Sequence, residues 1–224
     1  MYSQIIKQFI KQELLPPSYL TDAEKYFIPL IHLVMNKANE SKTPLIVGVS
    51  GAQGTGKTSL SELLENILKI EGFSVARISI DDFYLTKMDR QNLAKTQHPL
   101  LETRGVPGTH DTHLLSIILN ELINQTSKSP LEIPRFNKAL DDRFPKSKWK
   151  IINSPVDLII LEGWFVGATP IAVESLHKPI NELEATEDKN GSWRTFMAKQ
   201  LEDNYQNIFD QINFLIFLEA PSFE

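Results

Sequence analysis

The sequence predicts an α/β fold with a mainly parallel central sheet. Apolar runs of strand length recur along the chain, as in strands that are buried on both faces. Between them, apolar residues repeat at helical spacing, and the order strand, loop, helix, strand is that of a βαβ unit. The predicted strands are residues 44–50, 74–80, 156–161 and 212–218.

Length and composition limit the classes of protein to consider. The chain has 224 residues, so we expect a single domain over residues 1–224. Its formal net charge of −5 gives no global basic field, and we expect no nucleic-acid partner. The absence of cysteine excludes disulfides and thiolate metal sites, and it fits a reducing compartment. Oligomeric state stays open at this point.

Residues 1–40 predict a helical extension before the first strand. Residues 1–14 form a short amphipathic pattern that Pro16 and Pro17 stop. A second helix is expected near Thr21, because Thr21 and Glu24 have the spacing of a capping box. The apolar residues that follow at helical spacing are Phe27, Leu30, Ile31 and Val34.

No segment of the sequence predicts export or a membrane. Charged and amide residues interrupt the N-terminal apolar residues, which is unlike a signal peptide. No stretch approaches the roughly 18 uninterrupted apolar residues of a membrane-spanning helix. We therefore expect a cytoplasmic protein without a membrane partner.

Further helices are expected between the later strands. Apolar residues at helical spacing predict one from about Leu60 to Leu68, with Gly72 as its end. Two more are expected at residues 113–124 and 193–209. Residues 177–192 are polar and acidic, and we interpret them as a solvated excursion.

The stretch GAQGTGKTS follows the first strand and precedes a helix. It fits G-x-x-x-x-G-K-[ST], in which glycines let successive backbone N–H groups point at phosphate oxygens. Lys57 would reach the β- and γ-phosphates and the Thr58 hydroxyl would bind Mg²⁺, beside a favourable helix dipole. The stretch predicts ATP and Mg²⁺ as cofactors and a three-layer P-loop NTPase fold. The expected nucleotide-binding residues are Gly51, Ala52, Gln53, Gly54, Thr55, Gly56, Lys57, Thr58 and Ser59.

Two adjacent carboxylates, Asp81 and Asp82, end the second predicted strand. Ligands of an open parallel sheet gather at the carboxyl ends of its strands, so this segment and the glycine loop should share a crevice. A carboxylate there could accept the proton of an attacking hydroxyl. Adjacent side chains rarely point the same way, so we expect one base and one structural residue. Which is which stays open on the residues alone.

An acidic residue, Glu162, closes the strand VDLIIL. An acid at a strand end beside a P-loop is the usual Walker B arrangement, which reaches Mg²⁺ directly or through water. We therefore place Glu162 with Thr58 as a metal ligand.

Further candidates lie in two later segments. Arg104, His110 and Asp111 occur in TRGVPGTHD, and Arg135 and Arg143 lie in residues 135–150. Arginine suits a bidentate grip on carboxylate or phosphate. Residues 135–150 hold six Lys or Arg against two Asp, so we interpret them as a candidate lid over phosphates. The histidines show no metal-ligand spacing, and no zinc site is expected.

These motifs together resemble the D-glycerate 3-kinase family, near the uridine kinase, phosphoribulokinase and pantothenate kinase group. The resemblance runs from about residue 44 to the C-terminus and rests on the P-loop, SIDDFYLT, HPLLETRGVPGTHD, IPRFNKALDDR and DLIILEGWFVG. It implies that Asp81 is the catalytic base and that Arg143 is the lid arginine that stabilises the moving phosphoryl group. It also implies roles in catalysis for Lys57 and in metal binding for Thr58 and Glu162. The acceptor set that we expect is Asp82, Tyr84, Arg104, His110, Asp111 and Arg135.

The resemblance also predicts a longer chain. Members of the family continue past the LEAPSFE segment into a helix with a W-R-x-x-Q-E type signature and a further tail. This chain stops at Glu224, so we expect a truncated form or a fragment.

The leading hypothesis is an ATP-dependent kinase that phosphorylates a hydroxyl of a small acceptor, D-glycerate first. Arg104 is then the first choice for the cation that binds the glycerate carboxylate. One alternative is a kinase for a nucleoside or a pantothenate-like metabolite. Another is an ATP-binding regulator or assembly factor that hydrolyses ATP slowly or not at all. A GTPase switch is less favoured, because the sequence has no N-K-x-D segment.

Overall fold

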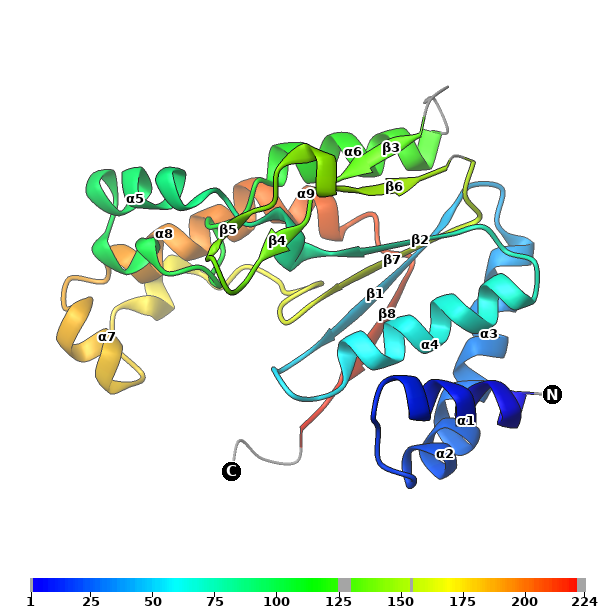
Figure 1. The fold of residues 1–224 in the computed structure, drawn as a ribbon. Helices are drawn as coiled ribbons and strands as arrows, with labels where there is room; N and C mark the ends of the chain where they lie inside the picture. The colour runs from blue at the N-terminus through cyan, green and yellow to red at the C-terminus, as the bar shows by residue number, and fades with distance from the viewer. Residues whose placement is uncertain (1, 125–129, 154, 221–224) are drawn as a thin grey trace.

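The computed structural model describes residues 2–124, 130–153 and 155–220. Within these residues, a four-stranded parallel sheet of order β2-β7-β1-β8 lies between two layers of helices (Figure 1). This arrangement confirms the predicted α/β fold with its parallel central sheet. The strands are β1 (Leu45–Gly51), β2 (Val75–Ser79), β7 (Leu158–Gly163) and β8 (Phe214–Leu218).

The two central strands, β1 and β7, are buried at every position. Helices cover both faces, so these strands appear in the sequence as continuous apolar runs. Ser50 pairs with Gly163 and Ser79 pairs with Glu162, so three strands end at one edge of the sheet. The glycine loop begins at this edge, where ligands of an open parallel sheet bind.

One face of the sheet is covered by helices from the N-terminal half of the chain (Figure 1). Ile6, Ile31 and Leu64 of these helices pack with Val47 and Ile160 of the sheet. The burial of this apolar surface stabilises the layer at about 25 cal/mol per Å². The helices are α1 (Tyr2–Gln12), α2 (Tyr19–Asp22), α3 (Ile28–Glu40) and α4 (Lys57–Ile70).

The other face is covered by helices from the later part of the chain. Leu119 and Phe209 pack there with Ile46 and Ile159 of the sheet. The sequence does not predict α5, whose first turn is capped by the Thr86 hydroxyl, which accepts the Asp89 N–H at 3.2 Å. The remaining helices are α5 (Lys87–Thr96), α6 (Thr112–Asn124), α7 (Glu182–Glu187), α8 (Ser192–Gln200) and α9 (Gln206–Phe209).

The N-terminal helices form as predicted, but the predicted capping box is wrong. Helix α2 begins at Tyr19, a π-helical turn (Ala23–Phe27) continues it into α3, and Thr21 therefore lies inside a helix. The backbone N–H of Tyr19 already donates to the carbonyl of Pro16 at 2.9 Å. Proline suits the first turn of a helix, so helical structure starts directly after the two prolines.

The interpretation of residues 177–192 as a solvated excursion is wrong in part. Helix α7 forms there, and its Glu184 is buried. Glu184 accepts a hydrogen bond from the buried Arg194 at 3.2 Å, and Asp188 lies 3.5 Å from the same guanidinium. The acidic residues are therefore needed inside the fold, because a buried guanidinium is costly unless it is paired.

The predicted lid, residues 135–150, belongs to two short antiparallel ribbons beside the edge strand β2 (Figure 1). The ribbon of β4 and β5 lies within the connection between the strands of the other ribbon. The strands are β3 (Leu131–Ile133), β4 (Phe136–Asn137), β5 (Asp142–Arg143) and β6 (Lys150–Ile152).

Among the described helices, none is long and apolar enough to cross a membrane. The end of the LEAPSFE segment, residues 221–224, lies outside the described residues.

Candidate active site

The glycine loop connects β1 to α4 and has the backbone that phosphate binding requires. Gly54 and Gly56 have φ of +83° and +86°, in the left-handed region that residues with a Cβ rarely adopt. The Thr55 hydroxyl donates to the carbonyl of Ala52 at 2.8 Å and closes the turn from within. The loop ends at the N-terminus of α4, which begins at Lys57. Free N–H groups at a helix N-terminus and the helix dipole favour an anion.

Lys57 folds back over this loop. Its ammonium group donates to the carbonyl of Ala52 at 2.7 Å. Burial lowers the pKa of Lys57, the charges of Glu162 and Asp81 oppose this shift, and the charge of Lys138 adds to it. These four charged groups therefore act on one another electrostatically at the carboxyl edge of the sheet.

Thr58 and Glu162 meet beneath the loop. The Thr58 hydroxyl donates to the two carboxylate oxygens of Glu162 at 3.4 and 3.3 Å. Burial raises the pKa of Glu162, an effect that a bound cation would reverse. One hydroxyl and one carboxylate fit Mg²⁺, which takes oxygen ligands and keeps waters and phosphate oxygens in its other positions.

The two adjacent carboxylates after β2 have different partners. Both belong to a 3₁₀ turn, Ile80–Phe83. Asp81 accepts the Tyr84 hydroxyl at 3.1 Å and the ammonium of Lys138 at 2.8 Å. Asp82 instead accepts the backbone N–H of Phe136 at 3.0 Å. The structure therefore brings Asp81, not Asp82, into contact with Lys138, whose charge also acts on the P-loop lysine.

His110 lies buried beside this turn. Its ring stacks on Tyr84 with centroids 4.3 Å apart, and Nδ1 is 2.8 Å from the Tyr205 hydroxyl. The Tyr205 hydroxyl also accepts the Gly108 N–H at 2.9 Å. We therefore assign the hydroxyl as the donor to Nδ1, which places the imidazole proton on Nε2. Burial lowers the pKa of His110 to about 3. The Nε2 atom is buried without a hydrogen-bond partner among the described residues.

Arg143, the predicted lid arginine, is bound to the protein itself. Its guanidinium lies 3.3 Å from the Asp111 carboxylate and donates to the carbonyl of Tyr84 at 2.9 Å. The other Asp111 oxygen accepts the N–H of Leu114 and caps α6. Arg143 and Asp111 thus tie the β4–β5 ribbon to the turn that carries Asp81.

The sequence does not predict a second set of ion pairs, formed by Arg90, Arg104 and Asp141, which we call the clamp. Arg90, with no exposed side-chain surface, donates to the Asp141 carboxylate at 2.8 Å and to its carbonyl at 2.7 Å. Arg104, the predicted acceptor cation, donates to the same carboxylate. Both guanidiniums lie over the ring of Phe136, at 5.6 and 5.5 Å. Asp141 has a φ of +53°, and this left-handed geometry at a non-glycine residue is a structural sign of the clamp that the sequence does not reveal.

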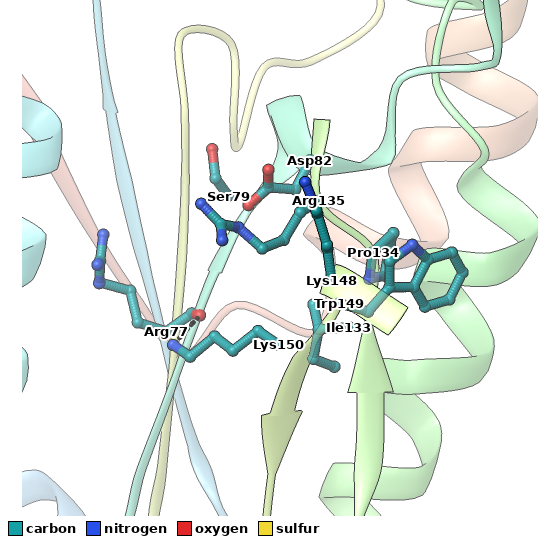
Figure 2. A pocket seen from close by; sticks show the side chains of 9 residues that line it. All are labelled: Arg77, Ser79, Asp82, Ile133, Pro134, Arg135, Lys148, Trp149 and Lys150. Carbon is teal, nitrogen blue, oxygen red and sulfur yellow. Dashed lines mark hydrogen bonds between the residues drawn. The ribbon is translucent and has the colours of Figure 1, made fainter. Parts of the chain in front are cut away.

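The other two residues of the expected acceptor set lie apart from the clamp. Asp82 and Arg135 line a separate cavity against β2 (Figure 2). The structure therefore divides the predicted acceptor residues into two groups. Tyr84, Arg104, His110 and Asp111 lie around Asp81 and the clamp, whereas Asp82 and Arg135 face this second cavity.

Comparison with known proteins shows which family the chain belongs to. No protein-family model matches the sequence. The chain is 35% identical over 184 residues to an uncharacterised kinase, mug58, of Schizosaccharomyces pombe, covering 79% of this chain and 65% of that protein. It is 33% identical over 176 residues to the chloroplastic D-glycerate 3-kinase of Arabidopsis thaliana, covering 71% of this chain and 38% of that protein. The resemblance to the D-glycerate 3-kinase family is confirmed.

A solved structure supports the same relationship. The D-glycerate 3-kinase from Cryptococcus neoformans superposes with a TM-score of 0.70 at 28% identity, covering 85% of this chain and 72% of that chain. The chain spans less than two thirds of the length of the two curated relatives. Its fold is that of the P-loop kinases.

Proposed function

We propose that the chain transfers the γ-phosphoryl group of ATP to a hydroxyl group of a small acceptor, and that this acceptor is D-glycerate. The observation that carries the proposal is the environment of Asp81. This carboxylate lies in the turn that follows β2, contacts Tyr84 and Lys138, and acts electrostatically on Lys57 of the P-loop. A regulator that only binds nucleotide has no need of a carboxylate in this position.

In the proposed reaction, Asp81 accepts the proton of the acceptor hydroxyl, and the hydroxyl oxygen bonds to the γ-phosphorus of ATP. The bond from this phosphorus to the bridging oxygen breaks, and ADP leaves with the bonding electrons. Lys57 exchanges its contact with the Ala52 carbonyl for phosphate oxygens, and Lys138 supplies a second positive charge. Phosphoryl transfer depends mainly on such positioning and charge stabilisation. Mg²⁺, held by Thr58 and Glu162, would neutralise phosphate charge.

Arg104 is the proposed cation for the acceptor carboxylate, with His110 Nε2 as a further donor. Arg104 already binds one carboxylate, that of Asp141, which supports this assignment. Arg90 can keep Asp141 in place when Arg104 turns to the acceptor. The Arabidopsis and Cryptococcus relatives are D-glycerate 3-kinases, which supports D-glycerate as the acid. Arg143, through Asp111 and Tyr84, would hold the ribbon over the site.

A coupled assay of ADP release tests both halves of the proposal. The acceptors to compare are D-glycerate, L-glycerate, nucleosides and pantothenate, each with ATP and Mg²⁺. We expect D-glycerate to raise ADP release at least about tenfold over the rate without acceptor, a barrier difference of roughly 1.4 kcal/mol. Preferential stimulation by pantothenate or a nucleoside would support phosphoryl transfer to a small molecule and would contradict D-glycerate as the acceptor. No stimulation by any acceptor would favour a nucleotide-binding regulator.

A further inference from the structure

A cavity lies between β2, the turn that carries Asp82, and residues 133–135 and 148–150. Its volume is about 350 Å³, which is within the range of small-molecule sites. Arg77 and Ser79 of β2 form one wall, and Asp82 lies at the turn (Figure 2). The opposite wall includes the cationic residues Arg135, Lys148 and Lys150.

Two of the cations at this cavity are already paired with carboxylates of the protein. The Arg77 guanidinium donates to Glu62 at 2.8 Å and to Glu65 at 2.6 Å, and in Figure 2 it points away from Asp82. Lys150 donates to the Arg77 carbonyl at 3.2 Å and lies 3.7 Å from Glu65. These two residues therefore already have carboxylate partners within the protein.

The other two cations, Arg135 and Lys148, have no carboxylate within salt-bridge distance in the described part of the chain. Both lie over the ring of Phe144, at 5.6 and 5.4 Å from its centroid. Both residues also line this cavity, and each positive charge there raises the affinity of the cavity for an anion. Figure 2 shows the Arg135 side chain reaching toward Ser79 and Asp82.

One acid, Asp82, faces these two unpaired cations. Burial raises the pKa of Asp82, and the Phe136 N–H and the charge of Arg135 lower it. The cavity therefore holds more positive than negative charge even when Asp82 is ionised. Arginine offers a planar pair of donors to a phosphate, and lysine adds a point charge.

We propose that this cavity binds a small phosphate-bearing anion, which Arg135 and Lys148 hold against the Ser79 end of β2. The cavity adjoins the candidate active site, because the Ser79 side chain hydrogen-bonds to Glu162 and Asp82 directly follows Asp81. The two cations proposed to hold the anion belong neither to the P-loop nor to the contacts of Asp81. The cavity needs neither ATP nor turnover to be occupied, so this proposal does not rest on the proposed kinase reaction. The ligand is either free phosphate or a phosphomonoester of metabolite size.

Calorimetric titration of the full chain tests the proposal. The probes are inorganic phosphate and glycerol 3-phosphate at low ionic strength, with saturating ADP so that the P-loop is occupied. We expect one phosphate-binding event, which Arg135→Ala and Lys148→Ala each weaken at least tenfold and which added salt also weakens. Tighter binding of glycerol 3-phosphate than of inorganic phosphate would identify a phosphomonoester as the ligand, and the reverse order would identify free phosphate.

Lys146→Ala is the matched control, because Lys146 lies in the same segment and outside the cavity lining. It removes the same charge and should change phosphate affinity less than twofold. Lys148 is exposed, so its variant should fold even where the Arg135 variant does not. The proposal is overturned if wild-type protein binds neither probe, or if Lys148→Ala binds as wild type does. If Lys146→Ala weakened phosphate binding as much as Lys148→Ala, the binding would reflect general charge attraction, and the proposal would also be overturned.

Discussion

The donor and acceptor sides of the candidate active site are built in different ways. The phosphate-binding part of the donor side is one stretch, residues 51–59, and its internal bonds span only a few positions, such as Lys57 to Ala52 five residues away. Only the proposed metal ligand Glu162 comes from elsewhere, 104 positions from Thr58. The acceptor side is held by ion pairs between distant residues. Arg143 and Asp111 are 32 positions apart, Arg104 and Asp141 are 37 apart, and Lys138 and Asp81 are 57 apart.

This difference has a physical consequence. Backbone conformation and a helix N-terminus are enough to bind phosphate, and both are encoded within a few residues. Recognition of an acceptor needs side chains from several elements, and their arrangement depends on tertiary pairing. The variants below separate the two sides, because each should alter nucleotide affinity or phosphotransfer selectively.

The largest effect is expected for Asp81→Asn on the acceptor side. Asparagine keeps the size of the side chain and loses the ability to take a proton, so kcat should fall by about 10²–10⁴. Nucleotide affinity, measured by calorimetry, should stay within a few-fold. Asp82→Asn should reduce kcat less, since Asp82 contacts the Phe136 N–H rather than Lys138. A greater loss of kcat with Asp82→Asn than with Asp81→Asn would show that Asp82, and not Asp81, is the base.

Lys57→Ala is the corresponding test of the donor side. It removes the cation of the P-loop, so nucleotide affinity and kcat should fall together, with kcat reduced by about 10²–10³. Lys69→Ala, at the other end of α4, is the control and should leave both quantities unchanged. If Lys57→Ala lowered kcat alone, the two sides would not be separable in the way that their construction suggests.

Much of the fold could be predicted from local sequence. The central strands are continuous apolar runs because they are buried on both faces, and α4 and α6 follow simple helical periods. The capping box at Thr21 was misplaced because a matching pair of residues does not fix where a helix starts. The polarity of residues 177–192 predicts a solvated segment, whereas Glu184 and Asp188 pair with a buried arginine.

The candidate site was predictable only in part. The spacing of Lys57 and Thr58 specifies their chemistry locally, whereas Asp81 could be separated from Asp82 only through resemblance. Arg90 and Asp141 could not be found at all, because nothing in their local sequence tells that they pair across 51 positions. In the sequence, Lys138 is one of six basic residues in 135–150, and only its contact with Asp81 in the structure distinguishes it from the others.

Lys138→Ala should have a smaller effect than either of the first two variants. Its side chain is 64% exposed, and exposed ion pairs contribute up to about 1 kcal/mol, so kcat should fall roughly fivefold. Nucleotide affinity should change little. Lys146→Ala in the same segment should match wild type in kcat. Equal values of kcat for the two variants would remove Lys138 from the proposed transfer and leave Lys57 as its principal protein cation.

The smallest effect is expected on stability and comes from His110. Burial lowers its folded-state pKa from the ordinary 6.5 to about 3, so between these values the unfolded chain binds a proton that the folded chain does not. The group therefore lowers the free energy of unfolding as pH falls below 6.5, by about 2 kcal/mol at pH 5. The variant His110→Gln has no group to protonate at this position. The difference between its free energies of unfolding at pH 7.5 and pH 5, measured by denaturant titration, should be about 2 kcal/mol smaller than in wild type. His113 is exposed on the first turn of α6, and His113→Gln should keep the wild-type difference. An unchanged difference in His110→Gln would mean that the histidine takes up its proton within the fold, and the buried acceptor side would then be far more open to water than the P-loop beside it.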